Sequence, residues 1–320
     1  MMRALFAEIE AAPGVERESE PARPMKPRVE LPHPIPYQGS KRLLAPRILS
    51  YVADRRFRRL YEPFSGSAAI TIAASHMRLA TEYVIGDSLA SLAALWQHIL
   101  SEPAALADQY ECLWAAHEEG SIEHYYRIRD AFNQQQDPAH LLYLLARCVK
   151  NAPRFNRNGL FNQSPDKRRL GMRPTKMRCE LFGAHVLLRD RACVMTGDFE
   201  GTIAGATGDD LVYMDPPYEG TSTGTDKRYY ESMDRVRLIR ALEGLDRRGV
   251  PYMLSYDGQS GTKRYGDYLP EHLDVKRIEL AAGRSSQATL NGRNETTIES
   301  LYVSRSLLDR PRATETRRAV

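Results

Sequence analysis

The stretch that decides the fold is "DDLVYMDPPYEG", residues 209–220. Its apolar run, residues 211–214, is typical of a short buried strand. The strand ends abruptly in a carboxylate, two prolines and an aromatic ring, which are Asp215, Pro216, Pro217 and Tyr218. Strand ends of an open α/β sheet are where ligands bind, so these residues are expected at a functional edge.

The four letters "DPPY" call for a chemical explanation, because chance would place them in about one chain of this length in a thousand. A rigid proline turn alone would need neither the acid nor the ring. An exocyclic amine on a nucleobase is a poor nucleophile, since its lone pair is delocalised. Asp215 can accept one amino hydrogen and the backbone carbonyl of Pro216 the other. The two prolines would hold these acceptors rigid, and the Tyr218 ring offers a face for stacking.

Apolar runs and helical patterns alternate through the rest of the chain. Strands are predicted at 59–64, 82–87, 192–199, 211–218, 251–258, 274–280 and 299–304. Helices are predicted at about 67–79, 89–101, 121–133, 137–150 and 231–247. This alternation predicts an α/β fold with a doubly wound, parallel sheet.

Composition sets the class of protein. The 320 residues are 42% hydrophobic and 27% charged, which is ordinary for a globular protein with one large domain or a domain with an insertion. No apolar run approaches the roughly 18 residues of a membrane span, and the N-terminus has no signal-peptide core. The four cysteines lack CxxC spacing, so neither zinc nor disulfides are indicated, and a cytoplasmic setting is expected.

The chain divides into segments of different character. Residues 1–30 and 305–320 are expected to be disordered tails, because they are rich in charge and poor in periodicity. Residues 31–100 and 190–304 carry the α/β pattern. Residues 101–189 interrupt that pattern with a mainly helical segment, which we interpret as an inserted second domain.

The inserted segment ends in a basic stretch. Residues 147–178 hold ten Lys or Arg against a single acid, Asp166. A solvated face is the plain alternative, but this imbalance favours a footprint for a DNA backbone.

A second candidate site follows the first predicted strand. "YEPFSGSAAITIAAS", residues 61–75, is typical of a strand, a small-residue turn and a helix, with Gly66 allowing close approach of a ligand. Asp87 closes the next strand 21 residues later, where nucleotide folds place an acid on ribose hydroxyls. A tight turn at Gly66 and a helix cap at Asp87 are the alternatives. Together the two signals favour a cofactor that contains a nucleoside.

At this point the sequence resembles the DNA adenine methylase family, in the group whose target-recognition domain lies between the cofactor motifs and the DPPY motif. The resemblance covers residues 33–304. It rests on "PYQGSKRLLAPRI" (36–48), "EPFSGSAAI" (62–70), "IGD" (85–87), "GDF" (197–199) and "DPPY" (215–218). Ser40 stands in the first motif where the family usually has glycine, and the second motif lacks the family's last glycine.

The resemblance implies a doubly wound mixed sheet of the Rossmann-like, S-adenosylmethionine-dependent methyltransferase type. It implies that S-adenosyl-L-methionine is held by Tyr37, Lys41, Phe64, Gly66, Asp87, Asp198, Phe199 and Asp215. Asp215, Pro216, Pro217 and Tyr218 become the catalytic residues. No metal is implied.

The inserted segment also resembles the family's recognition domain, through "YYRIRDAFN" (125–133) and "RFNRNGLFN" (154–162). The expected DNA-binding residues are Arg154, Asn156, Arg157, Asn158, Lys167, Arg168, Lys227 and Arg228. The last two lie in 219–230, a segment that we expect to close over a flipped base, with a mobile surface loop as the plain alternative. At 149–153 the chain reads "VKNAP" where the family commonly has an Asn-Gly-Leu run, so the residues that probe the duplex differ.

The implied function is methyl transfer to the N6 amino group of an adenine flipped out of double-stranded DNA. The protein would act as a monomer, with a restriction endonuclease encoded nearby as a candidate partner. Three alternatives remain open. An RNA methyltransferase would prefer RNA as acceptor, a non-catalytic DNA-binding protein would have no need of an intact DPPY, and a nicotinamide-dependent oxidoreductase would bind a different nucleoside.

Overall fold

The computed structural model describes residues 16–17, 30–116, 121–217, 234–260, 263–265, 267–284 and 296–311. The predictions for Tyr218, Lys227 and Arg228, and most of those for the two tails, therefore lie outside the described residues.

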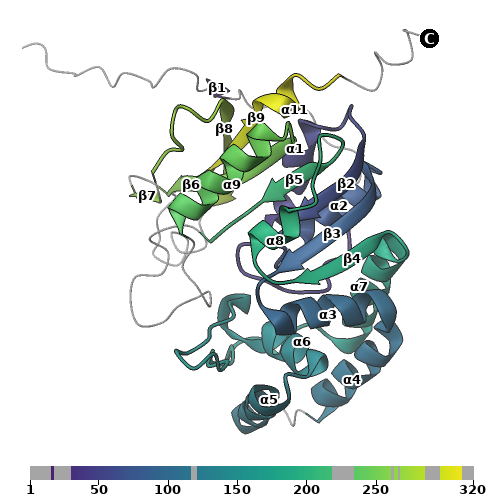
Figure 1. Ribbon diagram of the computed structural model, residues 1–320. Helices are drawn as coiled ribbons and strands as arrows, with labels where there is room; N and C mark the ends of the chain where they lie inside the picture. Colours follow the sequence, from purple (N-terminus) through teal and green to yellow (C-terminus); the bar gives the residue numbers. More distant parts are fainter. Residues whose placement is uncertain are drawn as a thin grey trace, which may run out of the picture.

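A single twisted sheet forms the centre of the molecule (Figure 1). Its main strands are β2 (Phe57–Glu62), β3 (Ala80–Asp87), β4 (Ala192–Thr196), β5 (Leu211–Met214), β6 (Tyr252–Ser260), β8 (Val275–Arg284) and β9 (Thr296–Ser304). They lie in the order β8-β9-β6-β5-β2-β3-β4. Two short strands add to the sheet: β1 (Glu16–Arg17) pairs with β8, and β7 (Lys263–Tyr265) pairs with β6.

The sheet is mixed. The five strands β4, β3, β2, β5 and β6 are parallel to one another, whereas β9 runs antiparallel to both β6 and β8. The fully parallel sheet predicted from the alternation is therefore wrong at this end, and the mixed sheet implied by the family resemblance is confirmed. No helical pattern separates β8 from β9 in the sequence, which is why alternation could not indicate their direction.

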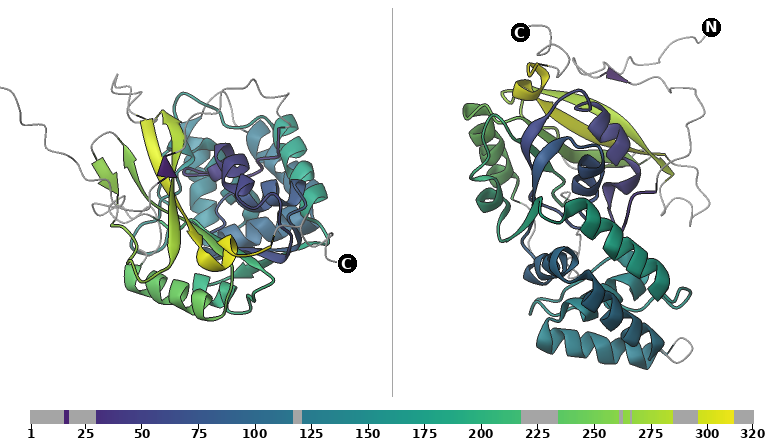
Figure 2. Two further views of the ribbon diagram at one scale, coloured as in Figure 1. Left: turned by 90° about the horizontal axis from the view of Figure 1, so that it is seen from above. Right: turned by 90° about the vertical axis from the view of Figure 1, so that its right-hand side faces the viewer.

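Helices cover both faces of the sheet (Figure 2). One apolar core joins the sheet to α1 (Ala45–Ser50), α2 (Ala69–His76) and α3 (Ala90–Ser101). The other joins it to α8 (Phe199–Ile203) and α9 (Arg235–Arg247). On β2, Leu60 belongs to the first core and its neighbour Tyr61 to the second, as the alternation of strand side chains requires.

The predicted helical insertion lies between β3 and β4 in sequence and occupies the lower part of Figure 1. It contains α4 (Pro103–Ala115), α5 (Ile122–Gln135), α6 (Pro138–Arg147), the short η2 (Val149–Asn151) and α7 (Pro174–Leu188). Asp137 fixes the start of α6, because its carboxylate accepts the N–H groups of Ala139 and His140. The segment packs on the sheet domain through α3, which contacts both α6 and α7.

The C-terminal boundary differs from the prediction. Residues after Ser304 form a short helix, α11 (Arg305–Leu308), instead of a disordered tail. Leu307 is fully buried in the first core, and the Ser304 hydroxyl accepts the backbone N–H groups of both Leu307 and Tyr252. The expectation of disorder is therefore wrong for residues 305–311, because one buried leucine and one capping serine tie this segment to β6.

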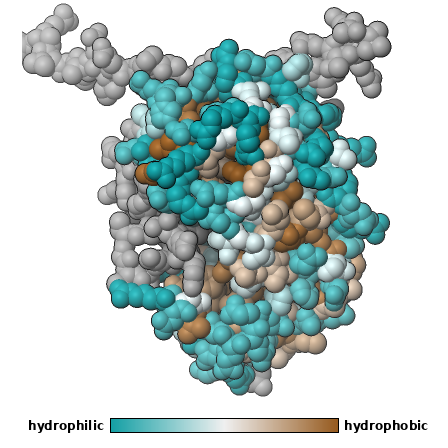
Figure 3. Space-filling view, viewed as in Figure 1, coloured by the Kyte–Doolittle hydropathy of each residue, from teal (hydrophilic) through white to brown (hydrophobic). Residues whose placement is uncertain are grey.

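Over the described residues, no helix is both long and apolar enough to cross a membrane. The face shown in Figure 3 is largely hydrophilic, and its apolar residues form separate patches.

Candidate active site

The candidate site lies where the strand order reverses. β2 has β3 on one side and β5 on the other, and crevices of this kind outside the carboxyl ends of strands bind ligands. Tyr61 of β2 pairs with Val212 of β5, so both strands end at the same edge. Glu62 ends β2 and Asp215 directly follows β5.

Lys41 meets Asp215 at this edge. Lys41 begins the short helix η1 (Lys41–Leu43), and its Nζ lies 2.9 Å from Asp215 Oδ1 and 3.3 Å from Glu299 Oε2. The lysine is 7% exposed and the aspartate 20%. Burial raises the pKa of Asp215 to about 6; the Lys41 ammonium opposes that rise, and the Glu299 carboxylate adds to it. The first cofactor motif and the DPPY motif, 174 residues apart in sequence, are therefore in direct contact.

The DPPY motif is anchored by the strand that precedes it. Tyr213 is fully buried, and its hydroxyl lies 2.8 Å from the Ser255 hydroxyl on β6. Pro216 is buried and Pro217 is half-buried. This anchoring holds the backbone that follows β5 against the sheet edge.

Asp87 links the glycine turn to the next helix. One carboxylate oxygen accepts the backbone N–H of Gly66 at 3.1 Å, and the other accepts that of Leu89 at 3.0 Å. Burial raises the pKa of Asp87, and these two hydrogen bonds oppose the rise. The helix cap expected as the alternative is wrong, because α3 has Leu89 at its N-cap and no side-chain cap hydrogen bond. Each Asp87 oxygen keeps a second lone pair, which can accept a hydrogen bond from a ribose hydroxyl.

The Gly66 turn and the segment that carries Lys41 form one structure. Gly66 has a φ of +47°, and a Cβ there would lie 3.3 Å from Cε1 of the Tyr37 ring. Its carbonyl accepts the indole N–H of Trp96 at 3.0 Å. The Ser67 hydroxyl donates to the hydroxyl of Ser40, which replaces the family glycine, at 2.7 Å across the turn. The small residues of both motifs are therefore explained by close packing of two backbone segments.

Residue 68 is where the second motif lacks the family's last glycine. Ala68 adopts a φ of +46°, a conformation in which an L side chain is strained, and it caps α2 without a side-chain hydrogen bond. The backbone shape typical of glycine is kept although the glycine is absent.

The "GDF" motif lies on the other face of the sheet. The Phe64 and Phe199 rings stack with centroids 5.1 Å apart. Asp198 caps α8 by accepting the Glu200 N–H, and it pairs with Arg237 of α9 at 2.9 Å. The Arg237 guanidinium also lies over the Phe199 ring. Asp198, expected to hold the cofactor, thus already has two partners, and sequence reasoning missed Arg237, whose helical position carries no signal of this contact.

Sequence reasoning also missed Glu62. It is 4% exposed, and its Oε2 accepts the backbone N–H of Thr71 at 2.8 Å. Burial raises the pKa of Glu62 to about 7, hydrogen bonds from Thr71 oppose the rise, and the nearby Asp215 charge adds to it. The available signal was an acid directly after the apolar pair Leu60 and Tyr61, within the quoted "EPF".

The two recognition motifs pack against each other. Asn133 of α5 brackets the Phe161 backbone, accepting its N–H at 2.8 Å and donating to its carbonyl at 3.0 Å. Phe161 also meets the Phe132 and Phe155 rings edge-on. The two segments that resemble the family, 125–133 and 154–162, therefore form one packed unit.

A tight loop projects from this unit. Residues Phe155 and Phe161 bridge its base, and Asn156 Oδ1 accepts the N–H groups of Asn158 and Leu160. Asn156 therefore stabilises the shape of the loop. This structural role was not part of its prediction as a DNA-binding residue. Arg157 and Asn158 are exposed at the tip, and Arg154 is half-buried at the base.

The basic stretch is smaller at the surface than its sequence indicates. Arg147 is buried and donates to the carbonyls of Asp166 and Arg169. Lys176 pairs with Glu180, and Arg178 pairs with Asp108 and Glu111. All three side chains have partners within the fold, although Lys176 stays exposed. The other exposed members are Lys150, Arg157, Lys167, Arg168, Arg169 and Arg173, of which Arg169 pairs with Asp166.

The departure from the family at 149–153 adjoins the candidate site. The Gln38 N–H donates to the Asn151 carbonyl at 2.8 Å, next to Tyr37. Lys150 and Asn151 both have positive φ, and the Asn151 amide donates to the Leu145 carbonyl at 2.8 Å. This turn therefore connects the inserted segment to the segment that carries Lys41.

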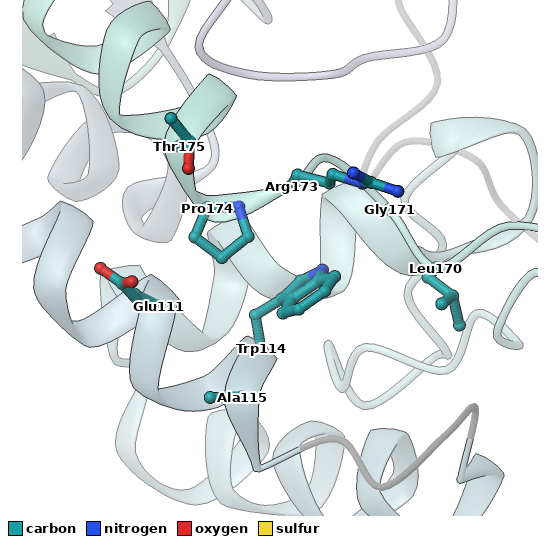
Figure 4. A pocket seen from close by; sticks show the side chains of 8 residues that line it. All are labelled: Glu111, Trp114, Ala115, Leu170, Gly171, Arg173, Pro174 and Thr175. Carbon is teal, nitrogen blue, oxygen red and sulfur yellow. The ribbon is translucent and has the colours of Figure 1, made fainter.

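A pocket of about 610 Å³ lies elsewhere, between the end of α4 and the start of α7 (Figure 4). Its lining residues are Glu111, Trp114, Ala115, Leu170, Gly171, Arg173, Pro174 and Thr175. None of the predicted site residues lines it.

The doubly wound mixed sheet, with an acidic motif after β5 and a helical segment between β3 and β4, has the architecture expected of an α/β methyltransferase. Comparison with known proteins then gives the family. The family model "D12 class N6 adenine-specific DNA methyltransferase" matches residues 37–285, and the chain belongs to this family. It is an adenine-specific DNA methyltransferase.

Relatives agree with this assignment. The retron Ec67 DNA adenine methylase of Escherichia coli is 28% identical over 240 residues, covering 72% of this chain and 80% of the relative. The type II methyltransferase M1.LlaDCHI of Lactococcus lactis subsp. cremoris is 25% identical, covering 80% and 90%. A DNA adenine methylase of Vibrio cholerae is 24% identical, covering 81% and 91%.

Proposed function

We propose that the chain transfers a methyl group from S-adenosyl-L-methionine to the N6 amino group of an adenine flipped out of double-stranded DNA. The observation that carries this proposal is the 2.9 Å contact between Lys41 and Asp215. It joins the segment that resembles a cofactor motif to the acid that would receive the adenine.

The residues around this contact suit such a cofactor. Gly66 lets the Tyr37 ring pack directly against the turn, and Asp87 keeps acceptor capacity for ribose hydroxyls. The carboxylates of Asp215 and Glu299 flank a single ammonium, that of Lys41, which favours a cationic ligand. The remaining proposed cofactor residues are Phe64, Asp198 and Phe199, which cluster at the end of β2.

When bound, the cofactor supplies a methyl group on a positively charged sulfur. Asp215 accepts one N6 hydrogen and the Pro216 carbonyl accepts the other, which draws the lone pair out of the ring. Pro217 stiffens this turn, and Tyr218 stacks on the base. N6 must then lose a proton, and the Asp215 carboxylate, whose pKa is about 6, is the acceptor at neutral pH.

Duplex DNA is the proposed substrate because the inserted segment offers a basic surface beside the site. Arg157, Asn158, Lys167 and Arg168 are exposed there, and Arg154 and Asn156 support the loop. The base must leave the duplex to reach Asp215, at a cost of a few kcal/mol. Lys227 and Arg228, outside the described residues, are proposed to hold the phosphates of the flipped base.

We further propose a cytoplasmic, monomeric enzyme. A restriction endonuclease encoded nearby is a candidate partner, since a relative carries the name of a type II methyltransferase.

The proposal is tested with labelled S-adenosylmethionine and mixed-sequence duplex DNA, with single-stranded RNA in parallel. We expect label in 6-methyladenine with the wild type and a loss of about 100- to 1,000-fold with Asp215→Asn, since the amide oxygen is a weaker acceptor and cannot take up the proton. Asp246→Asn, a half-buried aspartate on α9, is the matched control and keeps activity.

Three results would contradict the proposal. Preferred labelling of RNA would change the substrate, and full activity of Asp215→Asn would move catalysis to another residue. Absence of binding between wild type and cofactor in calorimetry would remove S-adenosylmethionine from the site.

A further inference from the structure

Glu299 is a half-buried acid to which neither sequence reasoning nor the family motifs assign a role. It lies on β9, directly opposite Gly258 of β6, where the register of the two strands shifts. A Cβ at Gly258 would lie 3.0 Å from the Ile298 carbonyl, so β6 and β9 approach closely here. The side chain is 18% exposed, and it reaches Lys41 from a strand 258 residues further along the chain.

Lys41 is thus held between two acids on separate strands. Its Nζ lies 2.9 Å from Asp215 Oδ1 and 3.3 Å from Glu299 Oε2. Both carboxylates approach the same nitrogen, so they share its charge. A single ammonium shared by two carboxylates neutralises each of them only in part.

We propose that Glu299 is a positioning residue that shares the Lys41 ammonium with Asp215, so that the charge of Asp215 is only partly neutralised and Asp215 stays a strong acceptor for the adenine amino group. This inference rests on the proposed function for the identity of the amino group, but the charge arrangement it describes belongs to the free protein.

The physical argument follows from the charges that face Asp215 from each neighbouring element. Within the described part of the chain these are Lys41 from η1, Glu299 from β9 and Glu62 from the end of β2. If Glu299 becomes neutral, Asp215 loses a repelling charge and Lys41 loses its competing partner. Both changes stabilise the ionised form of Asp215 and lower its pKa. A less basic carboxylate accepts a hydrogen bond less strongly, so methyl transfer slows.

The experiment uses Glu299→Gln, which keeps the shape of the side chain and removes its charge. The ¹³C shift of the Asp215 carboxyl is titrated in the free, full-length protein, with Asp215→Asn providing the assignment. The rate of a single turnover with duplex DNA is then measured between about pH 5 and pH 9, a range that spans the expected titration. Glu279→Gln is the matched control, because Glu279 is 22% exposed on the adjacent strand and pairs with Arg277.

We expect Glu299→Gln to lower the pKa of Asp215 by about one unit. The acid limb of the rate profile should move down by the same amount, and the plateau should fall by about tenfold. Glu279→Gln should change neither, and Glu299→Asp should restore part of the plateau because it restores the charge.

The proposal is overturned if the Asp215 titration is the same in Glu299→Gln and in the wild type. It is also overturned if the pKa falls while the plateau rate is unchanged. If Glu299→Gln does not fold, the titration of Glu299→Asp decides, since a shorter acid should still move it. A wild type without methyl transfer would contradict the proposed function, whereas the titration would still test the charge arrangement.

Discussion

The backbone N–H of Gly66 donates to the Asp87 carboxylate at 3.1 Å, while the Tyr37 ring lies where a side chain at residue 66 would have to go. Two other parts of the chain therefore contact the turn after β2. Asp87 of β3 binds its backbone, and Tyr37, in the segment that carries Lys41, packs against it. Three parts of the chain meet at one residue without a side chain.

Gly66→Ala should weaken cofactor binding by at least about tenfold. The new Cβ would lie 3.3 Å from the Tyr37 ring, at a φ of +47°, and would destabilise the fold by about 1–2 kcal/mol. Isothermal titration with S-adenosylmethionine and thermal unfolding measure the two effects. Gly201→Ala in α8 is the control, since a Cβ there meets no atom within 4 Å. Equal affinities for Gly66→Ala and wild type would contradict this prediction.

Ala68→Gly should stabilise the protein by about 0.5–1 kcal/mol, because it relieves a left-handed φ of +46°. Ala73→Gly, in the middle of α2, should have the opposite sign, at a cost of about 1 kcal/mol. Urea unfolding of both variants provides the comparison. If Ala68→Gly destabilised the protein, the backbone at Ala68 would not be strained.

Glu62 should make the fold less stable as pH rises. Its folded pKa of about 7 lies above the unfolded value of 4.5, so the folded state binds more protons between these values. Stability is therefore lost from about pH 4.5 to pH 7. Glu62→Gln should remove this slope and raise the free energy of unfolding at about pH 8 by on the order of 2 kcal/mol.

Urea unfolding at a series of pH values tests the effect of Glu62. The control is Glu82→Gln, since Glu82 is an exposed acid on β3 that pairs with Arg59, and its removal should leave the slope unchanged. The reasoning fails if Glu62→Gln and the wild type lose stability in parallel between pH 4.5 and pH 7.

Methyl transfer should show an acid limb near pH 6. Burial raises the pKa of Asp215 to about 6, and only the ionised carboxylate can accept both the hydrogen bond and the proton. The single-turnover rate should therefore fall about tenfold for each pH unit below 6. A rate independent of pH between about 5 and 8 would exclude Asp215 as the proton acceptor.

Arg157→Ala and Lys167→Ala should weaken DNA binding and each reduce the slope of log affinity against log salt by about one, because one phosphate fewer is neutralised. Both side chains are exposed on the inserted segment. Arg178→Ala is the control, because Arg178 already pairs with Asp108 and Glu111. Fluorescence anisotropy at several salt concentrations measures the slopes. If Arg178→Ala changed the slope more than Arg157→Ala or Lys167→Ala did, the DNA would bind to another surface.

Local patterns in the sequence predicted most of the fold. Short apolar runs indicated every main strand, and residues at the ends of strands β2, β3 and β5 were expected at one edge, where Gly66, Asp87 and Asp215 are found. Patterns of this kind depend on neighbours in the chain, so they can be recognised without the tertiary structure.

The direction of β9, the burial of Arg147 and the helix at 305–308 could not be predicted in this way. Each of these features depends on which distant segment lies beside it. From composition alone, Arg147 and residues 305–308 were expected to be exposed to solvent. The contact between Glu299 and Lys41 could not be predicted either, because nothing in the sequence around Glu299 indicates it.

The sequence by itself determined the residues that end the strands, because strand, turn and acid follow one another within a few positions. Only the tertiary structure decided how their charges balance. Lys41, Asp215 and Glu299 come from three separate segments, and the order of strands in the sheet brings one ammonium between two carboxylates. Electrostatic energy depends on distance in space and on burial, and neither is encoded in spacing along the chain.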